Sequence, residues 1–520
     1  MEKKKPIILS VIALLALVAL VVGATFAYFQ AQVGEGKSAD IVVKTYTVDT
    51  FTFATGSQIS LNLDQENFAS GKGNITGSTY ASAMLTANNK TNTATEHYYL
   101  YLNIENNTFT YSINENTPEI IMTITDNAGT EVTDITGLTH TSVTDANGTQ
   151  VSGYDITNKN GLITLFNNRE ITTTSSKEER WNIKVTFVNY DASQNANAGK
   201  SMSAKVMIQK EKITVANICN SGQTLSSCIM SMNDIDDALY YHNGTITSED
   251  GTVIDANDNS YRYAGASENV NNFVCFGATQ SPCPTDNLYR IIGVFGNNVK
   301  LIKYDYATSA LLGTDGDYYG TGTPDASFYK GSLETVDKYY WNYKANNSAS
   351  NTWSTSLFNK TNLNKNYLNN IGTTWSNLIE DTTWKVSGHT TYNVTPSAMY
   401  TAEITSASKT YGPSDGTSKI GLIYASDYGF AAEPSAWTIN LSSYSGSSII
   451  SVNWMYMGFH EWLMTPISSW DAAFVLSYNG RVGNLTMTQG YGIRPVLYLK
   501  SSVAYAGGSG TKDSPITLVV

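Results

Sequence analysis

The sequence Trp181-Asn-Ile-Lys-Val-Thr-Phe187 alternates between apolar and polar side chains at every position. In an extended strand, Trp181, Ile183, Val185 and Phe187 share one face, and the intervening polar residues share the other. This period of two is typical of a strand that buries one face and exposes the other. Residues 202–208 repeat the pattern, with apolar side chains at alternate positions.

Further strands and turns extend this pattern along the N-terminal half. Residues 99–104 and 120–125 are two more candidate strands. The turns Asp126-Asn-Ala-Gly129 and Asp145-Ala-Asn-Gly148 contain the residue types that tolerate positive φ. Many half-buried strands with polar turns predict that residues 38–212 form an all-β sandwich of jelly-roll-like type.

Residues 213–520 have a different character and predict an α+β domain. Asn479-Gly480 lies between two apolar runs and predicts a tight hairpin. The apolar run in residues 493–500 predicts a strand. Apolar residues at helical spacing in residues 362–371 predict a helix, and so does the acidic start of residues 234–241. The chain is therefore predicted to be multidomain.

The N-terminus has the three parts of a secretory signal. A basic start is followed by an apolar run over residues 7–29, with small residues near its end. Cleavage after Ala27 would leave a signal peptide of residues 1–27. The run is also close to the ~20 residues that cross a bilayer, so a membrane anchor ending at residue 29 is the alternative. Both readings place the rest of the chain outside the cytoplasm, extracellular or at the cell surface.

The composition favours an ordered, acidic protein. Hydrophobic residues make up 41% of 520 residues, whereas charged residues make up only 15%. The net charge of −12 argues against nucleic acid as a partner, because no basic stripe is available to neutralise phosphates. Contact with a membrane is expected only through the N-terminal segment.

The four cysteines lie in two local pairs, Cys219 with Cys228 and Cys275 with Cys283. Four cysteines allow three connectivities. The two local pairings would each close a polar turn, and an exported chain permits them. We therefore expect these two disulfides. A zinc site is the alternative, although no Cys-x-x-Cys spacing is present.

Known catalytic motifs are incomplete or missing in the sequence. His460-Glu461 begins like a zinc-protease helix, but the second ligand position is Met464. No Gly-x-Ser-x-Gly motif, Cys/His nucleophile pair or P-loop is found. We expect a protein that is not an enzyme, with no catalytic residues, no cofactor and no metal site.

Two acidic stretches leave a calcium site open as an alternative. Asp255-Ala-Asn-Asp-Asn259 resembles the start of a calcium-binding loop, but Ser260 and Ala266 replace the Gly and Glu that an EF-hand requires. Asp315-Gly-Asp317 is the second stretch. The simpler interpretation of both is an Asx-rich turn.

Several long loops of the C-terminal half are rich in aromatic and small polar residues. This composition is typical of recognition surfaces, where rigid aromatic rings supply contact area. Rings of this kind also fill the core of exported proteins, which is the competing interpretation. The expected ligand-binding residues are Tyr318, Tyr319, Tyr340, Trp341, Trp437 and Tyr444.

The N-terminal half resembles the TasA/camelysin-type exported proteins of Gram-positive bacteria. The resemblance rests on Val22-Gly-Ala-Thr-Phe-Ala-Tyr-Phe29 at the end of the signal and on residues 178–190 and 197–208. It implies cleavage by a dedicated signal peptidase, a β-sandwich, and assembly into matrix fibres through an N-terminal strand donated to a neighbour. Self-assembly is therefore an expected property.

The C-terminal half resembles a surface domain of unknown function that is common in Firmicutes. The matching segments are residues 283–295, 461–466, 492–499 and 508–515. Glu461-Trp-Leu and the distal Arg-Pro-Val strand are similar to the C-type-lectin-like fold of formylglycine-generating enzymes. That chemistry needs late cysteines, and none follows Cys283, so the likeness implies the fold alone.

These observations predict an exported bacterial surface or matrix protein with a β-sandwich stalk or fibre module and a binding domain. The expected activity is non-enzymatic adhesion to an unknown glycan or protein. The alternative is an extracellular hydrolase that uses carboxylates on cell-wall or host glycans. Trp462, Arg494 and Pro495 are expected to be framework residues, and a buried Arg494 would need an acidic or carbonyl partner.

Overall fold

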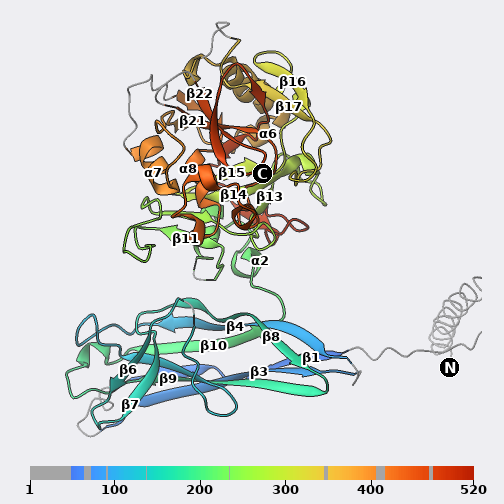
Figure 1. The fold of residues 1–520 in the computed structure, drawn as a ribbon. Coiled ribbons are helices and arrows are strands. Elements are labelled where there is room, and N and C mark those ends of the chain that lie inside the picture. Colours follow the sequence, from blue (N-terminus) through green and yellow to red (C-terminus); the bar gives the residue numbers. More distant parts are fainter. Residues whose placement is uncertain are drawn as a thin grey trace, which may run out of the picture.

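The computed structural model describes residues 49–63, 72–88, 92–135, 137–233, 235–344, 350–405, 416–467 and 472–520. The expected signal or anchor, residues 1–29, lies outside the described residues. The described chain is mostly β, with antiparallel strands in several sheets. Figure 1 shows two bodies, one formed by the blue to green N-terminal strands and one by the rest of the chain.

Residues 49–212 form the two-sheet domain. One sheet has six strands in the order β1-β3-β9-β5-β7-β6, and the other has four in the order β2-β10-β4-β8. The strands are β1 (Thr50–Thr55), β2 (Ile59–Asn62), β3 (Ile75–Thr86), β4 (Ala94–Asn107), β5 (Ile120–Thr125), β6 (His140–Thr144), β7 (Gln150–Asp155), β8 (Gly161–Thr173), β9 (Ser176–Phe187) and β10 (Ser201–Gln209).

The two sheets lie face to face around one apolar core. Trp181, Ile183 and Val185 of β9 point into this core, where they meet Leu100 and Leu102 of β4 from the other sheet. The alternation predicted for β9 is confirmed over residues 181–185, because positions 182 and 184 are exposed, whereas Thr186, predicted on the same polar face, is buried. Burial of one face fixes the register of such a strand, since a slip by one residue would expose every core side chain.

The predicted Asx-Gly turns are also confirmed. Asp126 Oδ1 accepts a hydrogen bond from Ala128 N at 2.8 Å, and Gly129 has φ of 82°. Asp145 plays the same part in the next turn, where Gly148 has φ of 81°. An L side chain at either glycine would strain the backbone.

Residues 213–520 form the C-terminal domain. Its largest sheet runs β11-β12-β14-β15-β25-β20, with β13 beside β14, and smaller sheets are β16-β17-β24, β21-β22-β23, β18-β19 and β26-β27. The strands are β11 (Leu239–His242), β12 (Ser260–Tyr263), β13 (Phe273–Cys275), β14 (Leu288–Phe295), β15 (Asn298–Lys303), β16 (Tyr318–Gly322), β17 (Val336–Tyr340), β18 (Thr382–Trp384), β19 (Gly416–Ser418), β20 (Ile420–Gly421), β21 (Glu461–Pro466), β22 (Ala472–Leu476), β23 (Val482–Thr486), β24 (Gly490–Tyr491), β25 (Val496–Tyr498), β26 (Tyr505–Gly507) and β27 (Thr517–Leu518).

The helices of the described chain are short. They are α2 (Val215–Ile218), α3 (Leu225–Met230), α4 (Ser309–Leu312), α5 (Leu368–Ile371), α6 (Thr373–Ser376), α7 (Pro396–Tyr400), α8 (Ala425–Phe430) and α9 (Ser447–Ile450), the π-helices η6 (Phe358–Tyr367) and η7 (Thr401–Thr405), and the 3₁₀ turns η3 (Asn195–Asn197), η4 (Thr285–Asn287), η5 (Trp353–Thr355), η9 (Pro434–Ala436) and η10 (Leu441–Ser443). Within this described part, none combines the length and the apolar character needed to span a bilayer.

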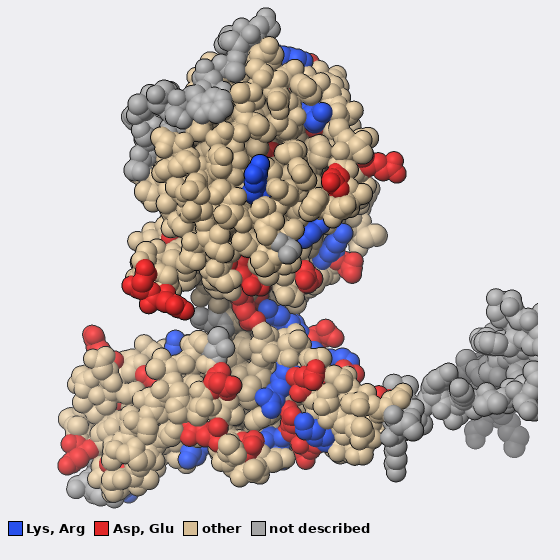
Figure 2. Space-filling view, viewed as in Figure 1, with Lys and Arg blue, Asp and Glu red and all other residues tan. Residues whose placement is uncertain are grey.

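The two domains are joined near residue 212, and no sheet described here mixes strands from both sides of it. Lys212 Nζ lies 3.0 Å from Asp236 Oδ1, and Ile213 N donates to Tyr101 Oη at 3.2 Å. Asn167 of β8 also donates to Asp237. Figure 2 shows acidic and basic side chains close to this junction, whereas much of the visible C-terminal surface is uncharged.

The structure confirms some local predictions for the C-terminal domain and contradicts one. The Asn479-Gly480 turn joins β22 to β23, and residues 362–371 lie in η6 and α5. The helix predicted over residues 234–241 is wrong, because Leu239–His242 is strand β11, paired with β12. Before it, the Asp236 carboxylate accepts from Ala238 N at 3.1 Å and so forms a turn.

Both predicted disulfides, Cys219–Cys228 and Cys275–Cys283, are present. The first joins the end of α2 to α3, and the second links β13 to the loop before η4. Each bridge closes a segment of fewer than a dozen residues, since the partners are 9 and 8 positions apart. They therefore fix local segments of the C-terminal domain.

Candidate functional site

Two of the predicted ligand-binding tyrosines form an open pair on a small sheet. Tyr319 of β16 is 45% exposed, and its ring centroid lies 4.8 Å from that of Tyr340 on β17, at an interplanar angle of 80°. Antiparallel pairing of β16 with β17 places these neighbouring strands side by side. The edge-to-face geometry is favourable for aromatic quadrupoles and leaves ring surface available to solvent.

Tyr343 and Gly490 complete this surface. The Tyr343 ring centroid lies 5.0 Å from that of Tyr340. A Cβ atom on Gly490 of β24 would lie 2.3 Å from Cγ of Tyr319, so only glycine leaves room for this ring. We call Tyr319, Tyr340 and Tyr343 the tyrosine surface. A three-stranded sheet supports it, because β24 pairs with β17 at Tyr340↔Gly490.

Two lysines flank the tyrosine surface. Lys338 Nζ lies 4.9 Å from the ring centroid of Tyr319, and Lys344 Nζ lies 5.9 Å from that of Tyr340. Lys344 Nζ also donates to the carbonyl oxygen of Tyr318 at 2.6 Å. Ammonium groups beside ring faces are attracted by the ring quadrupole. The arrangement offers flat apolar faces together with positively charged donors.

Tyr318 has a supporting position beside this surface. Its hydroxyl donates to Asp337 Oδ1 at 3.2 Å, and its ring packs against that of buried Tyr339 at 5.4 Å. Burial and the nearby Asp337 carboxylate raise the pKa of Tyr318, so its hydroxyl stays protonated at neutral pH. Tyr318 thus holds the pair of strands that carries Tyr319 and Tyr340.

The other three predicted ligand-binding residues are core residues, which corrects the prediction. Trp341, Trp437 and Tyr444 are each 0% exposed. The indole of Trp341 donates to Leu463 O at 3.0 Å, and that of Trp437 donates to Ala432 O at 2.8 Å. A ligand at the surface does not reach these rings, whose polar atoms are already bonded within the domain.

Sequence reasoning missed the lysines and the glycine of this site. Lys338 and Lys344 flank the run Tyr339-Tyr-Trp-Asn-Tyr343, and this spacing was a usable signal. Successive side chains of a strand point to opposite faces, so the pattern along β17 also distinguishes buried Tyr339 from the more exposed Tyr340. Nothing near Gly490 in the sequence indicated that it would lie beneath Tyr319.

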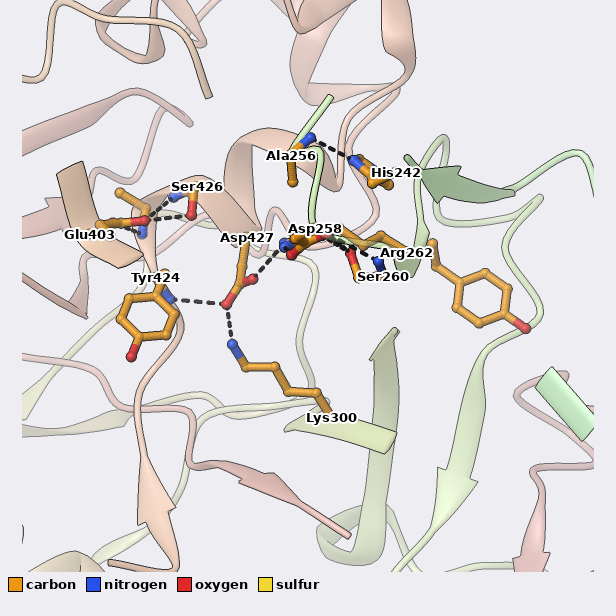
Figure 3. Close-up of polar contacts among 12 residues, drawn as sticks. His242, Ala256, Asp258, Ser260, Arg262, Lys300, Glu403, Tyr424, Ser426 and Asp427 are labelled. Carbon is orange, nitrogen blue, oxygen red and sulfur yellow. Dashed lines mark hydrogen bonds and ion pairs between the residues drawn. The ribbon is translucent and has the colours of Figure 1, made fainter. Parts of the chain in front are cut away.

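A second concentration of polar chemistry lies inside the C-terminal domain. Asp427 of α8 accepts from Arg262 Nη1 at 3.0 Å and from Lys300 Nζ at 2.5 Å, and Arg262 Nη2 lies 2.7 Å from Asp258 Oδ2 (Figure 3). Arg262, Lys300 and Asp427 are almost fully buried. Coulombic attraction to the carboxylates raises the pKa of both cations against the opposing effect of burial.

Glu403 is the neighbouring buried carboxyl group in Figure 3. It accepts from Ala425 N at 3.0 Å and from the Ser426 and Thr465 hydroxyl groups. Burial raises the pKa of Glu403 to about 7. Glu403 and Asp427 are 0% and 3% exposed, so a polymeric substrate does not reach either group in this conformation. The buried network is best explained as framework.

The remaining acidic candidates are also bonded within the fold. Glu461 lies in strand β21 and pairs with Arg494. Because this segment is a strand, it does not form the helix that a zinc-protease motif requires. Asp255 accepts from Gly244 N and Asn257 N, and buried Asp317 accepts from Lys344 N and Phe358 N. Within the described residues, no group of three or more His, Cys, Asp and Glu side chains is placed to hold a metal ion.

Comparison with protein-family models, with curated protein sequences and with solved structures gave no match to this chain. The tyrosine surface and the chemistry of its neighbours are therefore the features of this chain from which a function is inferred.

Proposed function

We propose that this is an exported cell-surface or matrix protein that binds a glycan through the tyrosine surface and catalyses no reaction. The observation that carries the proposal is the open Tyr319–Tyr340 pair, flanked by Lys338 and Lys344. Rigid aromatic side chains lose little entropy on binding, so they supply contact area at low cost.

A saccharide suits this surface for electrostatic reasons. The C–H bonds on one side of a pyranose ring carry partial positive charge and meet the negative face of an aromatic ring. The two lysines can donate hydrogen bonds to sugar hydroxyl groups or pair with acidic substituents. Tyrosine hydroxyl groups at the ring edges can make the same kind of polar contact.

The architecture supports an extracellular setting. Two disulfides fit an oxidising compartment, and the N-terminal segment reads as an export signal. We assign the two-sheet domain to the jelly-roll-like sandwich of TasA/camelysin-type proteins and the C-terminal domain to the C-type-lectin-like class. In this scheme the first domain is a stalk or fibre module, and the second domain carries the binding surface.

A glycan and cell-wall binding screen of the full mature chain tests the proposal. Tyr319→Ala combined with Tyr340→Ala should weaken binding of any hit at least about tenfold, equivalent to roughly 1.4 kcal/mol. Tyr241→Ala is the matched control, because Tyr241 stacks on Tyr261 at 4.5 Å on a different part of the same domain. Equal loss in the control, or no effect of the double variant, would overturn the assignment.

The same screen tests the rival hydrolase function. Each bound polysaccharide is incubated with the protein and assayed for new reducing ends. A non-enzymatic binding protein releases none. Release that is abolished by Asp427→Asn or Glu403→Gln in folded protein would instead establish carboxylate-dependent hydrolysis.

A further inference from the structure

The outer face of the six-stranded sheet contains two polar hollows. This sheet belongs to the two-sheet domain, whereas the tyrosine surface belongs to the C-terminal domain. The first hollow has a volume of about 200 Å³ and the second, which is more open, about 640 Å³. Hydroxyl and amide side chains dominate both linings. The linings include Thr76, Lys184 and Thr186 in the first hollow and Ser78, Thr79, Tyr80, Arg180 and Asn182 in the second.

Strand register shows that the two hollows are adjacent. On β3 and β9, Thr76 pairs with Thr186, Ser78 with Lys184 and Tyr80 with Asn182. Ser78 lines one hollow and its direct partner Lys184 lines the other. The two hollows are therefore neighbours at this pair, and together they are called the groove.

One hydroxyl group on the outer face has no hydrogen-bond partner. Thr186 is 2% exposed and its Oγ1 atom is unsatisfied, whereas the Thr79 side chain shares the core-facing side of the sheet with its partner Ile183. A buried polar atom without a partner lowers stability, so native proteins retain few of them. A hydroxylated ligand that displaces the side chains covering Thr186 Oγ1 would supply this group with a partner.

The groove also contains two cations without an acidic partner among the described residues. The Arg180 guanidinium lies 3.6 Å from the ring centroid of Tyr80, so the ring contacts the face of the guanidinium rather than its N–H edge. Lys184 is exposed. Several other lysines of this domain pair with carboxylates, as Lys205 does with Glu105 at 2.6 Å.

One carboxylate, Glu131, lines the first hollow but is already bonded. Glu131 Oε1 accepts from Ser152 Oγ at 2.9 Å and lies 2.9 Å from Nε2 of His140. The linings therefore carry two cations and one carboxylate, a net positive charge in a chain whose net charge is −12. Arg180 and Lys184 are four residues apart on one strand face, about 13 Å at the usual rise per residue.

We propose that this groove binds an acidic polysaccharide, independently of the tyrosine surface. Sugar hydroxyl groups would meet the Thr, Ser and Asn side chains, and uronate carboxylates would meet Arg180 and Lys184. The spacing of the two cations fits a chain with repeated charges better than a single small anion. The two-sheet domain is then a second binding module as well as a stalk.

Biolayer interferometry with immobilised oligogalacturonate and its methyl ester tests this on the full mature chain. The two ligands share their hydroxyl groups and differ in charge. We expect binding to oligogalacturonate that weakens at high salt, and at least about tenfold weaker binding to the ester. Arg180→Gln with Lys184→Gln should remove most of this preference.

Three further variants make the result specific. Thr186→Val keeps the charge and the volume but removes an unpartnered hydroxyl, so it should fold normally and weaken binding. Lys205→Gln, on the other sheet, should have no effect, and nor should Tyr319→Ala with Tyr340→Ala. Equal binding of acid and ester, equal loss in Lys205→Gln, or no binding of oligogalacturonate would overturn the proposal.

Discussion

Arg494 Nη2 lies 2.8 Å from Glu461 Oε2 in the interior of the C-terminal domain, and Arg494 Nε donates to both carboxylate oxygens at 3.0 Å. A fourth contact runs from Nη2 to Met455 O at 2.9 Å. Arg494 is 2% exposed and Glu461 0%, so the prediction of a buried arginine with an acidic partner is confirmed.

Removing one member of this pair should destabilise the domain strongly. Arg494→Ala would leave the Glu461 carboxylate buried without its cation, and such losses cost about 3–5 kcal/mol. The melting temperature should fall sharply in differential scanning calorimetry. Arg494→Met combined with Glu461→Leu is the matched control, because it removes both charges and should be far less damaging. Unchanged stability of Arg494→Ala with lost ligand binding would instead place Arg494 in a site.

Glu403 should make stability depend on pH. Burial raises its pKa from 4.5 to about 7 in the folded protein, so between these values the folded state holds a proton that the unfolded chain has released. Stability therefore falls as pH rises through this window, by roughly 3 kcal/mol for this group. Urea unfolding at several pH values should show a steeper decline for the wild type than for Glu403→Gln.

A rise of stability with pH, instead of a fall, would show that hydrogen bonds to the Glu403 carboxylate outweigh the effect of burial. Ala425 N and the Ser426 and Thr465 hydroxyl groups all donate to Glu403, and these bonds favour the carboxylate. If the wild type gains stability over Glu403→Gln as pH rises, these donors outweigh burial. The comparison concerns only how the unfolding free energy of each protein changes with pH. The amide introduced by Glu403→Gln would place an N–H donor against the existing donors, which lowers the stability of this variant by the same amount at every pH.

Each disulfide should stabilise a local segment and leave the two-sheet domain unaffected. Loops of this length contribute about 2–3 kcal/mol in the chain-entropy model. Cys275→Ser with Cys283→Ser should lower the unfolding free energy of the C-terminal domain by that amount. The double variant Cys219→Ser with Cys228→Ser should lower the unfolding free energy of the same domain by a similar amount. Non-reducing peptide mapping of the wild type should recover both local pairs, and a crossed pair would contradict this connectivity.

Local patterns in the sequence predicted those elements whose cause is also local. The alternation in β9 follows from burial of one sheet face, and the Asp126 and Asp145 turns follow from side-chain bonds within two residues. The Asn479-Gly480 hairpin belongs to the same class. In each case, the signal lies in neighbouring residues, so a short stretch of sequence is enough to predict the element.

Distant contacts account for the errors. Trp437 is buried because Phe430 and Tyr240 pack against it, with centroids 5.4 and 5.5 Å away, and Tyr240 is nearly two hundred residues distant in the chain. Strand β11 replaces the predicted helix because β12 pairs with it. Whether an aromatic ring lies in the core or at the surface depends on such partners. The composition that predicted the tyrosine surface therefore predicted three core residues as well.

The last prediction concerns assembly of the two-sheet domain. The order β1-β3-β9-β5-β7-β6 leaves one edge of β1 without a partner strand among the described residues. An unpaired edge accepts an additional strand, and cleavage after Ala27 would produce an apolar N-terminus beginning at Tyr28. We expect the mature protein to form concentration-dependent oligomers in sedimentation velocity, and a variant lacking residues 28–37 to be a folded monomer.

Oligomers that persist in this variant would assign association to another surface. A mature chain that stays monomeric at high concentration would show that the domain is a stalk only, and retention of residues 7–29 in protein isolated from cells would support the membrane anchor.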